Sequence, residues 1–157
     1  MAFPKIGNLA PLFSLKNQRG EAVTLKDYRG ERHVLLYFYP RASTPGCTVQ
    51  ACGMRDSAAA LAHNEMVVLA VSPDPIKRLQ NFTAKQSLNF DLLSDEDHAV
   101  ADKYGAWGLK KFMGREYDGI LRSSFIIGKD GRLKAIFDKV KTKTHHEDMI
   151  DWVESNL

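Results

Sequence analysis

The two cysteines of this chain lie close together in one short segment, YPRASTPGCTVQAC. Cys47 follows directly after a Thr-Pro-Gly turn, and Cys52 comes five residues later. A thiol attacks other molecules only as its thiolate, and two neighbouring thiols can also form a disulfide. The segment therefore indicates redox chemistry or, as an alternative, metal binding.

The elements predicted around Cys47 favour a reactive thiol. The run HVLLYFY, residues 33–39, is rich in β-branched and aromatic residues without alternation, which predicts a strand buried on both faces and ended by Pro40. A helix is expected from Cys47 to about His63. The unpaired N–H groups of a first helical turn favour negative charge, so we expect a thiolate at Cys47. The alternative for a lone cysteine is burial in the core.

The spacing of Cys47 and Cys52 has a geometric consequence. On an ideal helix their Cα atoms would lie about 8.6 Å apart and roughly 140° around the axis. A disulfide requires a Cα separation below about 7 Å. We therefore expect that the pair can bond only after the first turns unwind, and Gly53 should lower the cost of unwinding. An ordinary core position is the alternative for Cys52.

The remaining segments predict an α/β domain. A helix is predicted over residues 74–87, with Asp74 as the N-cap and Pro75 at the first helical position. Three glycines and three aromatic residues in 106–120 predict an ordered loop. The other predicted elements are a β-hairpin in 12–30, a strand over Met66–Ser72, a strand in 90–95, a short helix in 96–105, a β-hairpin in 122–138 and an amphipathic helix in 145–157 with Met149, Ile150, Trp152 and Val153 facing inward.

This element order predicts an α/β thioredoxin-like fold, in which a mixed sheet carries helices on both faces and an N-terminal β-hairpin. A chain of 157 residues with 44% hydrophobic residues is expected to form one domain over residues 1–157.

Charge and hydropathy exclude several classes of partner. The chain has 22 basic and 19 acidic residues, which is too even for a nucleic-acid or anionic-membrane surface. No apolar run has the length of a signal peptide or a membrane span, so we expect a cytoplasmic protein. We find no Gly-rich phosphate loop and predict no cofactor.

The segment YPRASTPGCT resembles the Pro-x-x-x-Thr-x-x-Cys signature of the peroxiredoxins, with Pro40, Thr44 and Cys47 in register. The segments TPGCTVQACGMRD, LLSDEDHAVADKYGAWG and FMGREYDGI, together with two adjacent histidines near the C-terminus, are similar to the bacterioferritin comigratory protein, or Q-type, subfamily. The resemblance covers nearly the whole chain in order.

This resemblance implies a thiol peroxidase that reduces hydrogen peroxide and organic hydroperoxides. Cys47 would be the peroxidatic residue and become a sulfenic acid. Thr44 would bind the peroxide, Pro40 would shield the site from water, and Arg122 would lie beside the sulfur. Cys52 would resolve the sulfenic acid as an intramolecular disulfide. Thioredoxin is the reductant that the resemblance implies, and we expect a monomer.

One residue departs from the subfamily, and other functions stay open at this point. Many relatives have Glu where this chain has Gln50, so we assign Gln50 no catalytic role. A thioredoxin-type thiol-disulfide oxidoreductase would require C-x-x-C spacing. A metal-binding module would combine Cys47 and Cys52 with His145 and His146, although adjacent histidines rarely chelate one ion. A binding or chaperone domain on the same fold is the third alternative.

Overall fold

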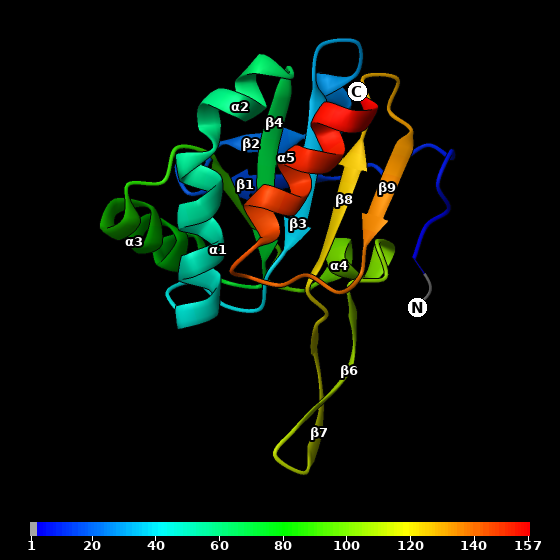
Figure 1. The fold of residues 1–157 in the computed structure, drawn as a ribbon. Helices are drawn as coiled ribbons and strands as arrows, with labels where there is room; N and C mark the ends of the chain where they lie inside the picture. The colour runs from blue at the N-terminus through cyan, green and yellow to red at the C-terminus, as the bar shows by residue number, and fades with distance from the viewer. Residues whose placement is uncertain (1–2) are drawn as a thin grey trace.

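A seven-stranded mixed sheet forms the centre of the protein, in the order β2-β1-β5-β4-β3-β8-β9 (Figure 1). The computed structural model describes residues 3–157. The strands of this sheet are β1 Ser14–Asn17, β2 Ala22–Thr24, β3 His33–Phe38, β4 Met66–Ser72, β5 Asp91–Ser94, β8 Ser123–Ile127 and β9 Leu133–Phe137. A separate two-stranded sheet pairs β6 Trp107–Phe112 with β7 Arg115–Ile120.

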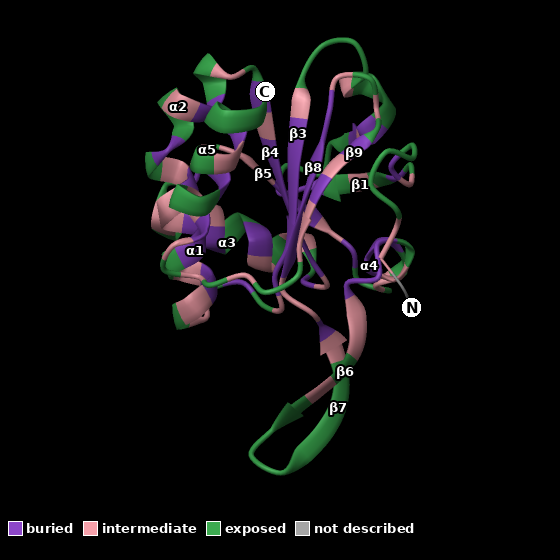
Figure 2. Ribbon diagram, turned by 45° about the vertical axis from the view of Figure 1, so that its right-hand side comes forward, coloured by how far each residue is buried: buried purple, intermediate pink, exposed green. Residues whose placement is uncertain are grey.

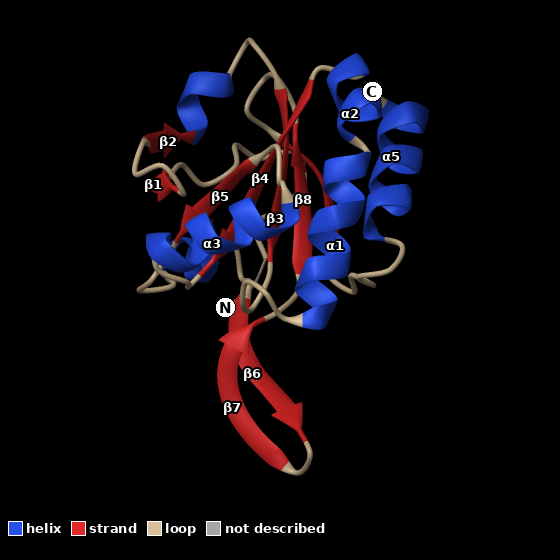
Figure 3. Cartoon of the chain, turned by 90° about the vertical axis from the view of Figure 1, so that its left-hand side faces the viewer, coloured by secondary structure: helices blue, strands red, loops and turns tan. Residues whose placement is uncertain are grey.

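Helices cover both faces of the large sheet. Figures 2 and 3 show α1, α2, α3 and α5 on one side, and Figure 2 shows α4 on the other. The helices are α1 Pro45–Asp56, α2 Ala58–His63, α3 Ile76–Gln86, α4 Ala99–Lys103 and α5 His145–Asn156, and the 3-10 turn η1 is Leu25–Tyr28. No helix among residues 3–157 is long and apolar enough to cross a membrane.

The central strand β3 separates two apolar cores. Its residues alternate, so that Leu35 and Tyr37 pack under α1 and α5, whereas Leu36 and Phe38 pack on the side of α4. Both faces of the strand are therefore buried, which explains why its sequence is apolar without alternation. The prediction of a mixed α/β sheet flanked by helices, with an N-terminal hairpin, is confirmed.

The topology gathers three chain segments at one edge of the sheet. β4 runs parallel to β3, so the residues after both strands lie at the same edge. β8 runs antiparallel to β3, with Ser123 opposite Phe38, so the residue that precedes β8 also lies there. The loop into α1, the loop into α3 and Arg122 therefore meet.

Three predictions about elements are corrected. Residues 106–120 form mainly the β6–β7 hairpin, which projects from the body in Figure 1, and not a loop. The helix predicted from Cys47 to His63 begins two residues earlier and is divided at Ser57. The third helix is capped by Pro75, not by Asp74, because the Asp74 side chain accepts hydrogen bonds elsewhere.

Candidate functional site

The Cys47 thiol lies against the guanidinium of Arg122. The distance from Arg122 Nη2 to Cys47 Sγ is 3.2 Å. Cys47 is 2% exposed and belongs to the core cluster under α1. The alternative expectation that this cysteine is buried is therefore confirmed. Its environment is nevertheless not inert, because the half-buried guanidinium of Arg122 donates to the sulfur.

Local sequence explains how Arg122 reaches the sulfur. Arg122 precedes β8 and is held at the edge where β3 ends. A Cβ at Gly46 would lie 3.3 Å from Arg122 Nη2, so the glycine leaves room for the guanidinium. Arg122 is therefore the group that occupies the space beside Gly46.

Gln50, to which the sequence assigned no role, holds the other side of Arg122. The Arg122 Nη1 group donates to Gln50 Oε1 at 3.1 Å, and Gln50 is fully buried. Gln50 comes three residues after Cys47 on α1, so both side chains lie on one face of the helix. The amide fixes the guanidinium without adding a negative charge beside the sulfur.

The N-terminus of α1 supplies polar groups next to Cys47. Pro45 is the first helical residue, and Thr44 is the N-cap with an extended backbone. The N–H groups of Gly46 and Cys47 fall in the first turn, where helices leave donors unpaired. The Thr44 hydroxyl donates to the Arg41 carbonyl at 2.9 Å and keeps its oxygen lone pairs available. Pro40 is half-buried in the same loop.

Cys52 lies in the same unbroken helix and is not bonded to Cys47. Its Sγ contacts Gln86 Oε1 at 3.5 Å, and the chain carbonyl of Gln86 accepts a 2.6 Å hydrogen bond from Arg55. The hydrogen bond to the Asp56 carboxylate raises the pKa of Arg55, and the neighbouring Cys52 adds to this effect. The second thiol therefore has a cation of its own nearby.

Gly53 has a packing role that the sequence did not indicate. A Cβ there would lie 2.4 Å from His146 Nδ1, so only glycine lets α5 approach α1 this closely. Unwinding the first turns of α1 would therefore also disturb a contact with α5, in addition to the helix itself.

Two further titratable side chains border the site. Burial, and then the charges of His146 and Arg122, lower the pKa of His145 to about 3. His145 Nε2 lies 2.7 Å from the Ser124 hydroxyl. Burial, and then the Arg122 charge, lower the pKa of Lys110 on β6. Nothing in the sequence indicated that Lys110 lies near the site, because residues 106–120 were expected to form a loop. A loop prediction does not indicate which side chains share a face.

The four residues of the metal-binding alternative do not converge. His145 is bound to Ser124, His146 packs on Gly53, and Cys52 faces Gln86. Among residues 3–157, no three His, Cys, Asp or Glu side chains gather closely enough to hold a metal ion.

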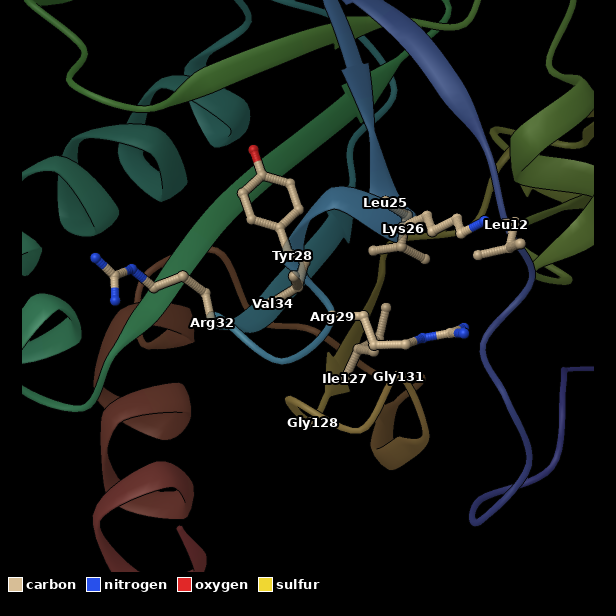
Figure 4. Close-up of a pocket in the computed structure, with 10 residues that line it drawn as sticks. All are labelled: Leu12, Leu25, Lys26, Tyr28, Arg29, Arg32, Val34, Ile127, Gly128 and Gly131. Carbon is tan, nitrogen blue, oxygen red and sulfur yellow. The ribbon is translucent and has the colours of Figure 1, made fainter.

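A pocket at the far end of the sheet belongs to a different region. Figure 4 shows it between η1 and the beginning of β3, with Leu25, Val34 and Ile127 in its lining. It offers about 10 Å³ to a water-sized molecule, which is about the volume that one water requires. Cys47 follows the opposite end of β3, so this pocket is not part of the candidate site.

Comparisons with known proteins agree with this geometry. Residues 6–136 match the model of the AhpC/TSA family. The chain is 55% identical to a putative peroxiredoxin bcp of Haemophilus influenzae, over 96% of each chain. It is 51% identical to peroxiredoxin Bcp of Escherichia coli K12, over 97% of each chain. A solved bacterioferritin comigratory protein of Xanthomonas campestris, studied for its alkyl peroxide reduction activity, superposes with a TM-score of 0.86 at 29% identity and covers 91% of this chain and 90% of its own. The thioredoxin-like fold and the predicted resemblance are thereby confirmed.

Proposed function

This chain belongs to the AhpC/TSA family, among its Bcp, or Q-type, peroxiredoxins, and we propose that Cys47 is the peroxidatic residue of this thiol peroxidase. The observation that carries the proposal is the 3.2 Å contact between Arg122 Nη2 and Cys47 Sγ at the N-terminus of α1. This contact presents a cation to the sulfur and to any oxygen that reaches it.

In the first step, the Cys47 thiolate attacks the terminal oxygen of a hydroperoxide. A sulfur–oxygen bond forms, the oxygen–oxygen bond breaks, and the departing oxygen leaves as alkoxide or hydroxide, which takes up a proton to become alcohol or water. Arg122 and the first N–H groups of α1 are donors that stabilise the charge on the departing oxygen. The Thr44 hydroxyl joins them when its O–H turns from the Arg41 carbonyl to the peroxide. Pro40 keeps bulk water from the sulfur.

In the second step, Cys52 attacks the sulfur of the sulfenic acid. A disulfide forms and hydroxide leaves, which is protonated to water. The first turns of α1 unwind for this step, because two cysteines five residues apart on a helix are too distant to bond. A dithiol protein of the thioredoxin class then reduces the disulfide and becomes oxidised itself.

The substrates that we propose are hydrogen peroxide and organic hydroperoxides. The described activity of the Xanthomonas campestris relative supports the organic class. We also propose that the protein works as a cytoplasmic monomer, since its resolving thiol is in the same chain. Light scattering on the reduced and oxidised protein would test the assembly.

The two cysteine roles are separated by peroxide turnover coupled to thioredoxin, thioredoxin reductase and NADPH consumption. Cys47→Ser should show no turnover, whereas Cys52→Ser should consume one peroxide per chain and then stop unless an outside thiol is added. A Cys47→Ser variant that still turns over would exclude this mechanism, and a Cys52→Ser variant at full rate would assign resolution to another molecule.

The donors around the sulfur have a test of their own. Arg122→Ala or Thr44→Val should lower the second-order rate with hydrogen peroxide by about a hundredfold or more, as the loss of a transition-state donor does. The loss should exceed the change in thiolate fraction, measured by ultraviolet absorbance. Arg115→Ala, which removes an exposed arginine of β7, is the matched control and should keep the full rate. Equal losses in rate and thiolate fraction would show that the sulfur alone carries the chemistry.

A further inference from the structure

Asp74 is a buried carboxylate that the mechanism above does not use. It is 6% exposed and follows β4, at the edge of the sheet where the candidate site lies. Its Oδ2 accepts a hydrogen bond from the Ala42 N–H at 2.7 Å and another from the Ser72 hydroxyl at 2.8 Å. Arg78 lies beside the other oxygen, at 3.5 Å from Oδ1. One oxygen of this buried side chain therefore accepts a hydrogen bond from the backbone of another loop.

The partner of this carboxylate belongs to the loop between β3 and α1. Ala42 is 1% exposed, so without Asp74 its N–H would be a buried donor with no acceptor. The next residue, Ser43, has a φ of 66°, a left-handed conformation that costs free energy in any residue other than glycine. The loop therefore needs an outside contact to keep its shape. Thr44 and the first turn of α1 follow immediately.

We propose that Asp74 is a positioning residue for the peroxidatic loop: its carboxylate fixes the Ala42 N–H and thereby sets the position of Thr44 and of the α1 N-terminus around Cys47. This inference rests on the proposed function. Asp74 touches neither the sulfur nor Arg122, which approaches Cys47 from β8 on the other side of β3. Loss of the anchor should therefore disturb the donors for the peroxide and leave the Arg122–Cys47 pair in place.

Because Asp74 and Arg122 contact different parts of the site, loss of Asp74 should slow peroxide reduction but not alkylation of Cys47. Peroxide reduction requires Thr44 and the helix N–H groups to meet the departing oxygen, whereas alkylation of a thiolate requires only the sulfur. In a Cys52→Ser background, Asp74→Ala should lower the rate of Cys47 oxidation by hydrogen peroxide about tenfold or more, since small misplacements of catalytic groups cost this much. The rate of alkylation by iodoacetamide, followed by mass spectrometry, should not fall by more than about twofold.

Conservative variants separate positioning from general damage. Asp74→Asn keeps an oxygen that can accept from Ala42, so its peroxide rate should stay within about threefold of the parent. Arg78→Ala removes only the partner of the other oxygen and should keep the full rate. If Asp74→Ala does not fold, Ser72→Ala removes one of the two donors to Oδ2 and should show a smaller defect of the same kind. Unchanged peroxide rates in Asp74→Ala or Ser72→Ala, or equal losses in both reactions, would overturn the proposal.

Amide hydrogen exchange tests the anchor without any turnover. In Asp74→Ala the Ala42 amide should exchange about tenfold faster or more, since a buried hydrogen bond is lost, while the amides of β3 keep their protection. A parent protein that does not react with peroxide would contradict the proposed function. The exchange result would still show whether Asp74 holds the Ala42 N–H. Unchanged exchange at Ala42 would show that Asp74 does not hold the loop.

Discussion

At the scale of single residues, the site depends on the contact between the buried Cys47 and the half-buried Arg122. Cys47 is only 2% exposed, and a bare thiolate at that depth would be costly. Arg122 balances the charge, and Gln50 satisfies part of the guanidinium without a second anion. Gln50 therefore holds Arg122 through a hydrogen bond that brings no charge to the site.

His145 gives the protein a predicted acid sensitivity. Burial lowers the pKa of His145 to about 3, far below the ordinary value of 6.5, so the folded protein keeps the ring neutral. The unfolded chain takes up the proton first, and stability due to this ring is present above pH 6.5 and is lost as the pH falls from about 6.5 towards 3. The contribution to the slope is about 1.4 kcal/mol of unfolding free energy per pH unit.

The test is urea unfolding at a series of pH values between 7 and 4. His145→Gln has no titrating ring and retains a group that can reach Ser124, so its unfolding free energy should fall less steeply than that of the parent. His63→Gln, on the exposed side of α2, is the matched control and should follow the parent. Parallel curves for the parent and His145→Gln would show that another group causes the acid sensitivity.

At the scale of elements, α1 has two opposing requirements. It must be intact to hold Cys47 at its N-terminus, and it must unwind to bring Cys52 to the sulfenic acid. Its contact with α5 through Gly53 and His146 opposes the unwinding. Glycine at position 53 lowers the stability of the helix itself. It also allows the close packing of α1 against α5.

A double-mutant cycle separates these two roles of Gly53. Gly53→Ala alone should destabilise the protein by about 1–3 kcal/mol, because the new methyl group overlaps the His146 ring. In a His146→Ala background the same change should be neutral or stabilising by about 0.5–1 kcal/mol, since alanine is the better helix former. Urea unfolding of the four proteins measures the coupling, and additive effects would show that the ring does not restrict this position.

At the scale of the whole molecule, β3 joins two cores. The core under α1 and α5 and the core on the side of α4 use alternate residues of this one strand. Neither core can lose its order without exposing the other. The chain is therefore expected to behave as one domain, whereas β6 and β7 form a separate two-stranded sheet that projects from the body (Figure 2).

The two tryptophans allow this expectation to be measured. Trp107 packs against the core on the side of α4, and Trp152 packs against the core under α1 and α5. In Trp107→Phe and Trp152→Phe, the remaining tryptophan reports one core only. Each variant should give a fluorescence midpoint in urea that coincides with its own far-ultraviolet circular dichroism midpoint. A fluorescence midpoint in either variant that differs from its circular dichroism midpoint would indicate two folding units.

The sequence alone determined most of the fold. The buried strands β3 and β4, the two flanking hairpins of the large sheet and the C-terminal helix carry patterns set by local burial, which a single chain segment reveals. The cysteine spacing also sufficed to exclude a disulfide within an intact helix. The β6–β7 hairpin was missed because most of its side chains are exposed, so burial imposes no alternation of apolar residues there.

Only the tertiary structure decided which distant side chains meet. Arg122 could be assigned to the sulfur from the family resemblance, but its contact arises because β8 runs antiparallel to β3. Asp74 carried a helix-cap pattern and instead binds a neighbouring loop, since β3 and β4 are parallel and end together. Gly53 and His146 are far apart in sequence and meet where two helices cross. Such contacts depend on strand direction and helix packing, which no local pattern encodes.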